Sequence, residues 1–306
     1  MALKTKPLRP GLVLGPVPYL WDPVTWRDFY HRIADEADVD TVVVGETVCS
    51  KRLHFFDALL DGVVDRLLAA GKTVRLATLG LVTLDRELRA GTRLAARGLP
   101  IEVSELSVHA LLAGRTHTIG PLVNVYNAPT ARVLWKGGAT SICLPPELPL
   151  TAVGAIASAV SEVAFEVHAF GRVPLAISAR CAHARVKGQT KDNCRFVCGD
   201  DPDGLIVDTL DGQRFLALNG VQTMSGTVQC LLGDVPAVLA AGVSALRLSP
   251  QVCDMVAIAG LFRSVADGRL DPAEAMATAR TLYPVDYSNG FIHAQPGHVL
   301  HEARVT

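Results

Sequence analysis

Short apolar runs alternate with longer amphipathic stretches along almost the whole chain. The runs are rich in Val, Leu and Ile and are bounded by Gly, Pro and polar residues, as buried parallel strands are when both of their faces are covered. Ten runs predict strands, at residues 12–14, 41–44, 74–78, 101–103, 116–119, 141–144, 164–167, 205–209, 215–218 and 245–248.

The stretches between these runs predict helices. The clearest covers residues 55–70, where Phe56, Leu59, Leu60, Val63 and Leu67 recur at spacings of three and four. Weaker helical patterns cover 84–96, 106–113, 129–136, 151–161 and 257–265, and a short one follows Pro272. Glycine follows four of these segments, as it does at helix C-termini, at Gly71, Gly98, Gly114 and Gly137.

Repeated strand–helix alternation indicates a parallel α/β fold. Seven or more such units favour a closed or nearly closed barrel, and the opening GLVLGPVPYL does not match a dinucleotide-binding fingerprint. Between residues 171 and about 203 the alternation stops and the chain becomes polar. We therefore expect one domain over residues 1–306, a TIM-like parallel (β/α) barrel, complete or distorted, with a long cysteine-bearing loop.

Composition narrows the class of protein. The chain has 306 residues, of which 49% are hydrophobic, enough for one large core. A net charge of -1 without basic blocks gives no nucleic-acid footprint. No run reaches the ~18 apolar residues of a membrane span, and no signal-peptide run precedes the first Gly and Pro residues. These features predict a cytoplasmic protein without a transmembrane segment.

Cysteine spacing carries the most specific chemistry. Cys181, Cys194 and Cys198 form a C-x12-C-x3-C cluster, and Cys49 ends a distant apolar run. Thiolates select zinc, copper(I) or iron–sulfur clusters. Structural zinc usually uses two tight Cys pairs, and only one is present here, so the spacing favours an iron–sulfur cluster over zinc.

Other interpretations of the cysteines remain open at this point. They are a redox disulfide between Cys194 and Cys198, unpaired buried thiols, and a zinc site to which His183 contributes. Three further cysteines stand in apolar or mixed surroundings and are predicted to be small buried hydrophobes. They are Cys143, Cys230 and Cys253.

Candidate substrate contacts follow strands, because sites in parallel barrels collect at the carboxyl ends of strands. Glu46 shares a loop with Cys49, and Arg52 and Arg180 flank two of the clustered thiols. An arginine fork suits the carboxylates of a small acid. The alternative is that both arginines neutralise a cluster or brace the loop. No residue is assigned as catalytic.

One stretch carries a family resemblance. FEVHAFGRVPLAISARCAHAR, residues 165–185, resembles the signature of the collagenase-like peptidase family at Glu166, Gly171, Ser178 and Cys181. Two further motifs, GETVCSKR at residues 45–52 and LNGVQTMSG at 218–226, are similar to the branch of that family that serves ubiquinone biosynthesis.

The resemblance implies a barrel fold and a [4Fe-4S] cluster on Cys49, Cys181, Cys194 and Cys198. It also implies a heterodimer with a UbiU-like sister subunit and a UbiT-like lipid carrier. The implied reaction is oxygen-independent hydroxylation of the ring of ubiquinone precursors, with prephenate as the hydroxyl donor, which makes the chain an enzyme subunit. Alternatives are a peptidase with a Cys–His pair, an RNA-hydroxylation factor and a structural subunit that stabilises its partner.

Overall fold

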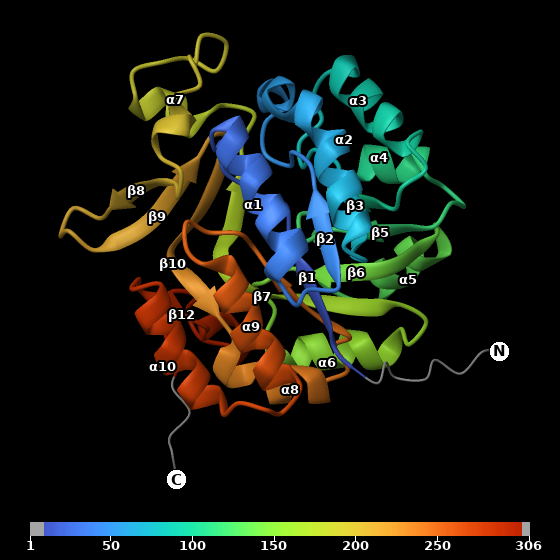
Figure 1. Ribbon diagram of the computed structural model, residues 1–306, viewed down its shortest axis with the longest axis vertical. Coiled ribbons are helices and arrows are strands. Elements are labelled where there is room, and N and C mark those ends of the chain that lie inside the picture. Colours follow the sequence, from blue (N-terminus) through green and yellow to red (C-terminus); the bar gives the residue numbers. More distant parts are fainter. Residues whose placement is uncertain (1–8, 302–306) are drawn as a thin grey trace.

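The computed structural model describes residues 9–301 and contains a closed barrel of eight parallel strands. Each strand pairs with the next, and the last strand pairs with both its predecessor and the first, which closes the ring (Figure 1). The TIM-like prediction is therefore confirmed. The strands are β1 Gly11–Leu14, β2 Thr41–Val44, β3 Thr73–Ala77, β4 Ile101–Val103, β5 His117–Ile119, β6 Ala139–Leu144, β7 Ala164–Ile177 and β11 Ala245–Leu248.

Helices surround the barrel on its outer side (Figure 1). They are α1 Pro23–Glu36, α2 Leu53–Ala69, α3 Asp85–Ala95, α4 Leu106–Leu111, α5 Ala128–Lys136, α6 Leu150–Ala159, α8 Val235–Ala240, α9 Met255–Ala266 and α10 Pro272–Leu282. The sequence patterns missed α1, although its start carries a clear signal. Asp22 accepts hydrogen bonds from the backbone N–H groups of Val24 and Thr25, and Pro23 occupies the first turn.

The strand β7 continues beyond the barrel, where the sequence patterns predicted an irregular loop. Up to Val167 it pairs with β6, and from Phe170 onward it pairs antiparallel with β10 (Gln222–Cys230). The turn out of the barrel occurs at Gly171, whose φ is +113° and where a Cβ would lie 2.7 Å from that of Ser249. The expected break at residue 171 is therefore a bend within a strand.

Three further strands build on this extension. β9 (Arg214–Asn219) pairs with β10, β8 (Leu205–Asp208) pairs with β9, and β12 (Tyr287–Ser288) pairs parallel with β10. The expected cysteine loop, between β7 and β8, contains a short helix, α7 (Ala182–Val186), and a 3-10 turn, η2 (Val197–Asp200). This insertion lies above the barrel beside α1 (Figure 1).

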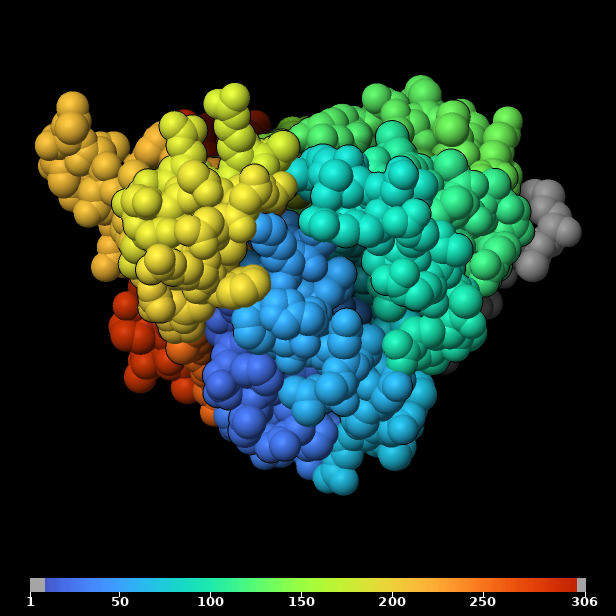
Figure 2. Space-filling view, turned by 90° about the horizontal axis from the view of Figure 1, so that it is seen from above, coloured from blue at the N-terminus to red at the C-terminus, as the bar shows by residue number. Residues whose placement is uncertain are grey.

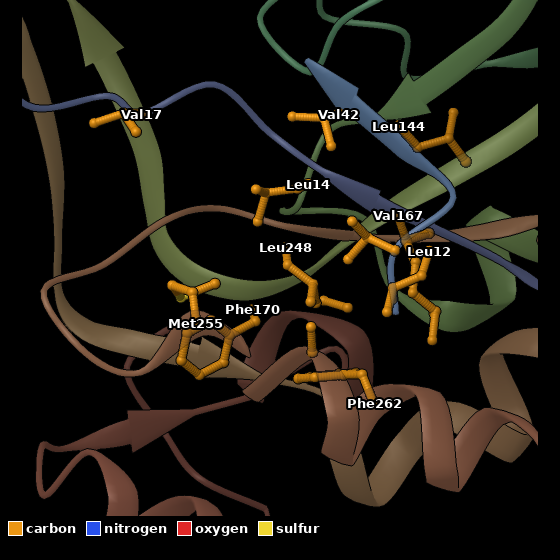
Figure 3. Packing of buried hydrophobic residues seen from close by; sticks show 14 of the residues in the cluster. Leu12, Leu14, Val17, Val42, Leu144, Val167, Phe170, Leu248, Met255 and Phe262 are labelled. Carbon is orange, nitrogen blue, oxygen red and sulfur yellow. The ribbon is translucent and has the colours of Figure 1, made fainter. Parts of the chain in front are cut away.

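The apolar core lies between the outer wall of the barrel and the helices. Figure 3 shows Leu12 and Leu248 from adjacent strands beside Phe262 of α9. The rings of Phe170 and Phe262 pack edge to face with centroids 6.1 Å apart, and both are fully buried. This side of the barrel is thus fixed by aromatic packing.

The barrel interior is polar. Arg247 binds both carboxylate oxygens of Glu102 at 2.6 and 2.8 Å, and Arg75 binds Glu166 at 2.6 Å. Arg247 also lies 3.6 Å from the second oxygen of Glu166, so the four side chains form one charge-balanced network across the barrel. Removal of one member of such a buried network leaves an uncompensated charge, which costs several kcal/mol.

Within residues 9–301, no helix has the length and apolar character needed to cross a lipid bilayer. Residues 1–8, which belong to the segment where no signal peptide is expected, lie outside the described range.

We expect Phe262→Ala to lower the free energy of unfolding by about 3–5 kcal/mol, because it leaves a cavity against Phe170. The control is Phe215→Ala, since Phe215 is 60% exposed and its loss should change stability by about 0.5 kcal/mol or less. Urea denaturation measures both. Equal effects of the two changes would contradict the described core.

His168 makes folding stability depend on pH. Burial lowers its pKa from 6.5 to about 4 in the folded protein. As pH falls from 6.5 to about 4, His168 takes up a proton in the unfolded chain before it does so in the folded protein. The free energy of unfolding therefore decreases over this range, by about 3 kcal/mol at most, from its value above pH 6.5. His168→Gln should abolish this part of the pH dependence in urea titrations, and an unchanged slope would refute it.

Candidate metal centre

Four cysteines from two distant segments line one cavity. Cys49 follows β2 and precedes the 3-10 turn η1 (Ser50–Arg52), whereas Cys181, Cys194 and Cys198 belong to the insertion after β7. Viewed from above, the yellow insertion lies against the blue segment near residue 50 (Figure 2). The fold therefore brings together the four thiols that the sequence singled out.

Two residues in left-handed conformation shape the loop between Cys194 and Cys198. Arg195 has φ +48° and Phe196 has φ +56°, which costs roughly 1–3 kcal/mol for each non-glycine residue. The ring of Phe196 packs edge to face on Phe55 of α2, with centroids 4.9 Å apart. This aromatic contact holds the strained turn against the helix that follows Cys49.

The thiols are largely shielded from water. Cys181 and Cys198 are each 9% exposed, and Cys181 packs with Val48, Ala184 and Val221. Burial raises the pKa of Cys49 and Cys198, because a thiolate loses its hydration there. Thiolates in this cavity therefore need positive charge beside them.

Arg52 supplies such a charge and is 1% exposed. Its Nη1 donates to the carbonyl oxygen of Pro18 at 2.9 Å and its Nη2 to Asn219 Oδ1 at 2.8 Å. Its Nε is buried without a hydrogen-bond partner in the protein. The guanidinium lies close enough to Cys198 to lower the pKa of that thiol, against the larger opposite effect of burial.

Lys51 adds a second cation at the edge of the cavity. Its Nζ donates to the carbonyl oxygen of Lys191 at 2.6 Å, which ties the loop after β2 to the insertion. The cavity thus combines four thiols with positive charge from both segments.

The other two candidate substrate residues occupy different positions. Glu46 is buried, and its Oε1 accepts hydrogen bonds from the backbone N–H groups of Val48 at 2.6 Å and Cys49 at 3.0 Å. It therefore braces the loop that carries Cys49. Arg180 is exposed, one residue before Cys181. Of the two arginines, Arg52 has the position expected of a brace or a neutralising charge.

The structure bears on the other interpretations of the cysteines. All seven cysteines, Cys194 and Cys198 included, are free thiols in this structure. The two ring nitrogens of His183 lie 3.0 Å from Leu218 O and from Asp201 Oδ2, so neither faces a thiol as a base or a metal as a ligand. Cys143 and Cys230 are buried elsewhere, as expected of small hydrophobes, whereas Cys253, for which burial was also expected, is half-buried at the edge of the core.

The four thiols that line this cavity are soft donors, which suit zinc, copper(I) or an iron–sulfur cluster. The adjacent buried Arg52, with its unpartnered N–H, would fit the negative charge of an iron–sulfur cluster.

Comparison with known families agrees with the signature around Cys181. A family model described as peptidase family U32 matches residues 25–302. The chain belongs to this family. Its collagenase-like resemblance is thereby confirmed at the level of the family. The matched range of the U32 model includes both cysteine-bearing segments.

Two solved structures were compared with this U32 chain. A phospho-2-dehydro-3-deoxyheptonate aldolase from Thermotoga maritima is 9% identical, with 92% of this chain and 72% of that chain covered and a TM-score of 0.35. A tryptophan synthase from Mycobacterium tuberculosis is 13% identical, with 89% and 93% covered and a TM-score of 0.31.

A substitution at Gly220 tests whether the Arg52 side chain is packed as described. It has φ +61°, and a Cβ there would lie 2.7 Å from Arg52 Nη2. Gly220→Ala should lower the free energy of unfolding by about 1–2 kcal/mol through backbone strain and by a further 1 kcal/mol or more through the clash.

The matched control for this change is Gly212→Ala, because Gly212 has φ +79° and no atom within 4 Å of the added Cβ. It should show the strain alone. Chemical denaturation compares the two variants, and equal losses would mean that Arg52 is not fixed beside Gly220.

Proposed function

We propose that the chain is the iron–sulfur subunit of an oxygen-independent hydroxylase that acts on the ring of ubiquinone precursors. In this proposal it is a UbiV-like protein that works as a heterodimer with a UbiU-like sister subunit. A UbiT-like lipid carrier presents the ring, and prephenate provides the hydroxyl group. The observation that carries the proposal is the single cavity lined by Cys49, Cys181, Cys194 and Cys198.

Two further observations support it. Membership of peptidase family U32 agrees with the signature at residues 165–185, within which Cys181 stands. The motifs GETVCSKR and LNGVQTMSG, which resemble the ubiquinone branch, contribute Cys49, Arg52 and Asn219 to the neighbourhood of the cavity. These two motifs thus contribute one of the four thiols and the arginine beside them, and Cys181, Cys194 and Cys198 lie outside both.

A [4Fe-4S] cluster held by the four cysteines would supply one-electron transfer. The protein's own residues prepare the site for it. Glu46 fixes the backbone at Cys49, Arg52 offsets negative charge without contact with solvent, and Phe196 closes the cavity against α2. With all four thiols committed as ligands, substrate binding falls to other residues or to the partner subunit.

A peptidase mechanism receives no support from this geometry. A cysteine nucleophile requires an adjacent base, and the nearby histidine, His183, directs both ring nitrogens to Leu218 and Asp201. A purely structural subunit is the main competing function, and it makes different predictions for a variant that lacks one thiol.

Anaerobic purification followed by iron, sulfide and zinc analysis tests the proposal. We expect close to four irons and four sulfides per chain, with a broad visible absorption that dithionite bleaches. Cys198→Ala should lose most of the iron, whereas Cys253→Ala should retain it, because Cys253 does not line the cavity. One zinc per chain without iron would contradict the proposal.

The heterodimer assay separates the two functions. If Cys198→Ala abolishes ring hydroxylation in an intact complex with the sister subunit, the cluster has a role in the reaction. If the same variant fails to fold or to assemble while the reaction is unaffected in the residual complex, the subunit is structural.

A further inference from the structure

A cavity opens between two neighbouring helices of the outer ring, α2 and α3 (Figure 1). The helix α2 packs on α1, and α3 packs on α4, but α2 and α3 make little direct contact with each other. The cavity between them has a volume of about 270 Å³ and reaches Gly45 and Ala77, where β2 and β3 end. None of the four clustered thiols lines it. We call it the interhelical cavity.

Apolar side chains form most of the wall of the interhelical cavity. They are Trp26, Leu53, Phe56, Leu60 and Leu94. The rings of Trp26 and Phe56 stack with centroids 4.8 Å apart, and both are buried. Because the volume lies just below the about 300 Å³ at which pockets for drug-sized ligands begin, the cavity suits one aromatic ring with short polar substituents.

One carboxyl oxygen in this lining has no hydrogen-bond donor in the protein. Glu46 is 5% exposed, and its Oε1 accepts the backbone N–H groups of Val48 and Cys49. No residue between 9 and 301 donates a hydrogen bond to its Oε2. Arg52 offsets part of the charge of Glu46 but donates its hydrogen bonds elsewhere. An O–H or N–H group on a ligand would supply the donor that Oε2 lacks.

An acid and a base stand on opposite walls at the mouth of the cavity. Asp57 of α2 and Arg93 of α3 also line a wider groove that continues from the cavity, and both side chains are exposed. Within the described range, neither of them has an ion-pair or side-chain hydrogen-bond partner. Arg97, which also lines the cavity, is ion-paired with Asp61. Two opposite charges held apart in this way match the ammonium and carboxylate groups of a zwitterion.

We propose that the interhelical cavity binds a free aromatic α-amino acid whose ring carries an O–H or N–H group. The ring lies against Trp26 and Phe56, and its polar hydrogen is donated to Glu46 Oε2. At the mouth, Asp57 binds the ammonium group and Arg93 binds the carboxylate.

Glu46 places this site one side chain away from the thiols. Its Oε1 holds the backbone N–H of Cys49, whereas its Oε2 is the atom assigned to the ligand. The inference goes beyond the proposed function and does not depend on it, because no thiol lines the interhelical cavity and amino-acid binding can be measured with or without iron in the protein.

Four probe molecules separate the three recognition elements. L-Tyrosine carries all of them. L-Phenylalanine lacks the ring hydroxyl, tyramine lacks the carboxylate, and 3-(4-hydroxyphenyl)propionate lacks the ammonium group. Equilibrium dialysis of the full chain against radiolabelled L-tyrosine should show saturable binding, and each of the other three should compete at least tenfold more weakly than unlabelled tyrosine. Absence of saturable tyrosine binding, or equal competition by the propionate, would overturn the proposal.

Variants of α3 place the binding within the cavity. Arg93→Ala should weaken tyrosine binding at least tenfold, and Ala90→Phe should abolish it, because Ala90 lines the cavity and a ring there occupies the ligand's space. The matched control is Arg89→Ala, since Arg89 is exposed on the same helix and lines neither the cavity nor the groove. Its affinity should equal that of the unchanged protein. If Ala90→Phe binds tyrosine normally, or if Arg89→Ala loses as much affinity as Arg93→Ala, the assignment is wrong.

Discussion

The bend of β7 at Gly171 is the constraint on which the thiol cavity depends. Before the bend, β7 closes the barrel with β6 and β11; after it, the same strand carries the sheet formed by β10, β9 and β8. A side chain at residue 171 would collide with Ser249, and L-residues rarely adopt its φ of +113°. Without this bend, the insertion that holds three of the four thiols would not lie above the barrel.

The barrel interior meets a second constraint, which is the free-energy cost of burying charged side chains. Arg75, Glu102, Glu166 and Arg247 come from four strands and neutralise one another, so none is left as an isolated ion. Such a network contributes little net stability compared with an apolar filling, but it fixes how the opposite walls face each other. Arg172 lies outside this network, and its Nη2 is 3.8 Å from a carboxylate oxygen of Asp203.

Much of the barrel was predictable from the sequence. Buried parallel strands appear in it as continuous apolar runs, and the helices appear as apolar residues at spacings of three and four. The runs at 41–44 and 245–248 coincide with β2 and β11. In the extension, the runs at 205–209 and 215–218 coincide with β8 and β9. The strand β10 was not predictable in this way, since it begins with the polar stretch Gln222–Thr223 and contains Gly226, so it lacks an apolar run.

The candidate metal centre was likewise predictable from the sequence only in part. Cysteine spacing identified all four thiols that line the cavity, because soft ligands stand out in any sequence. It could not reveal that Arg52 is buried or that the buried Oε1 of Gln222 lacks a hydrogen-bond partner. Both properties arise from residues far apart in the chain, at Pro18 and Asn219 for Arg52 and around the barrel mouth for Gln222. The burial of Arg52 and the missing partner of Gln222 arise only when the closed barrel brings these distant residues together.

The pairing of β11 with β1 has a consequence for synthesis on the ribosome. Gly11 pairs with Ala245, so the ring cannot close until nearly the whole chain has been made. By then the four cavity thiols have left the ribosome, and they stay exposed to solvent until the barrel closes. They belong to Cys49, Cys181, Cys194 and Cys198. Contacts so distant in sequence form slowly. Oxidation of exposed thiols therefore competes with barrel closure, and the newly made chain depends on a reducing environment before it depends on any ligand.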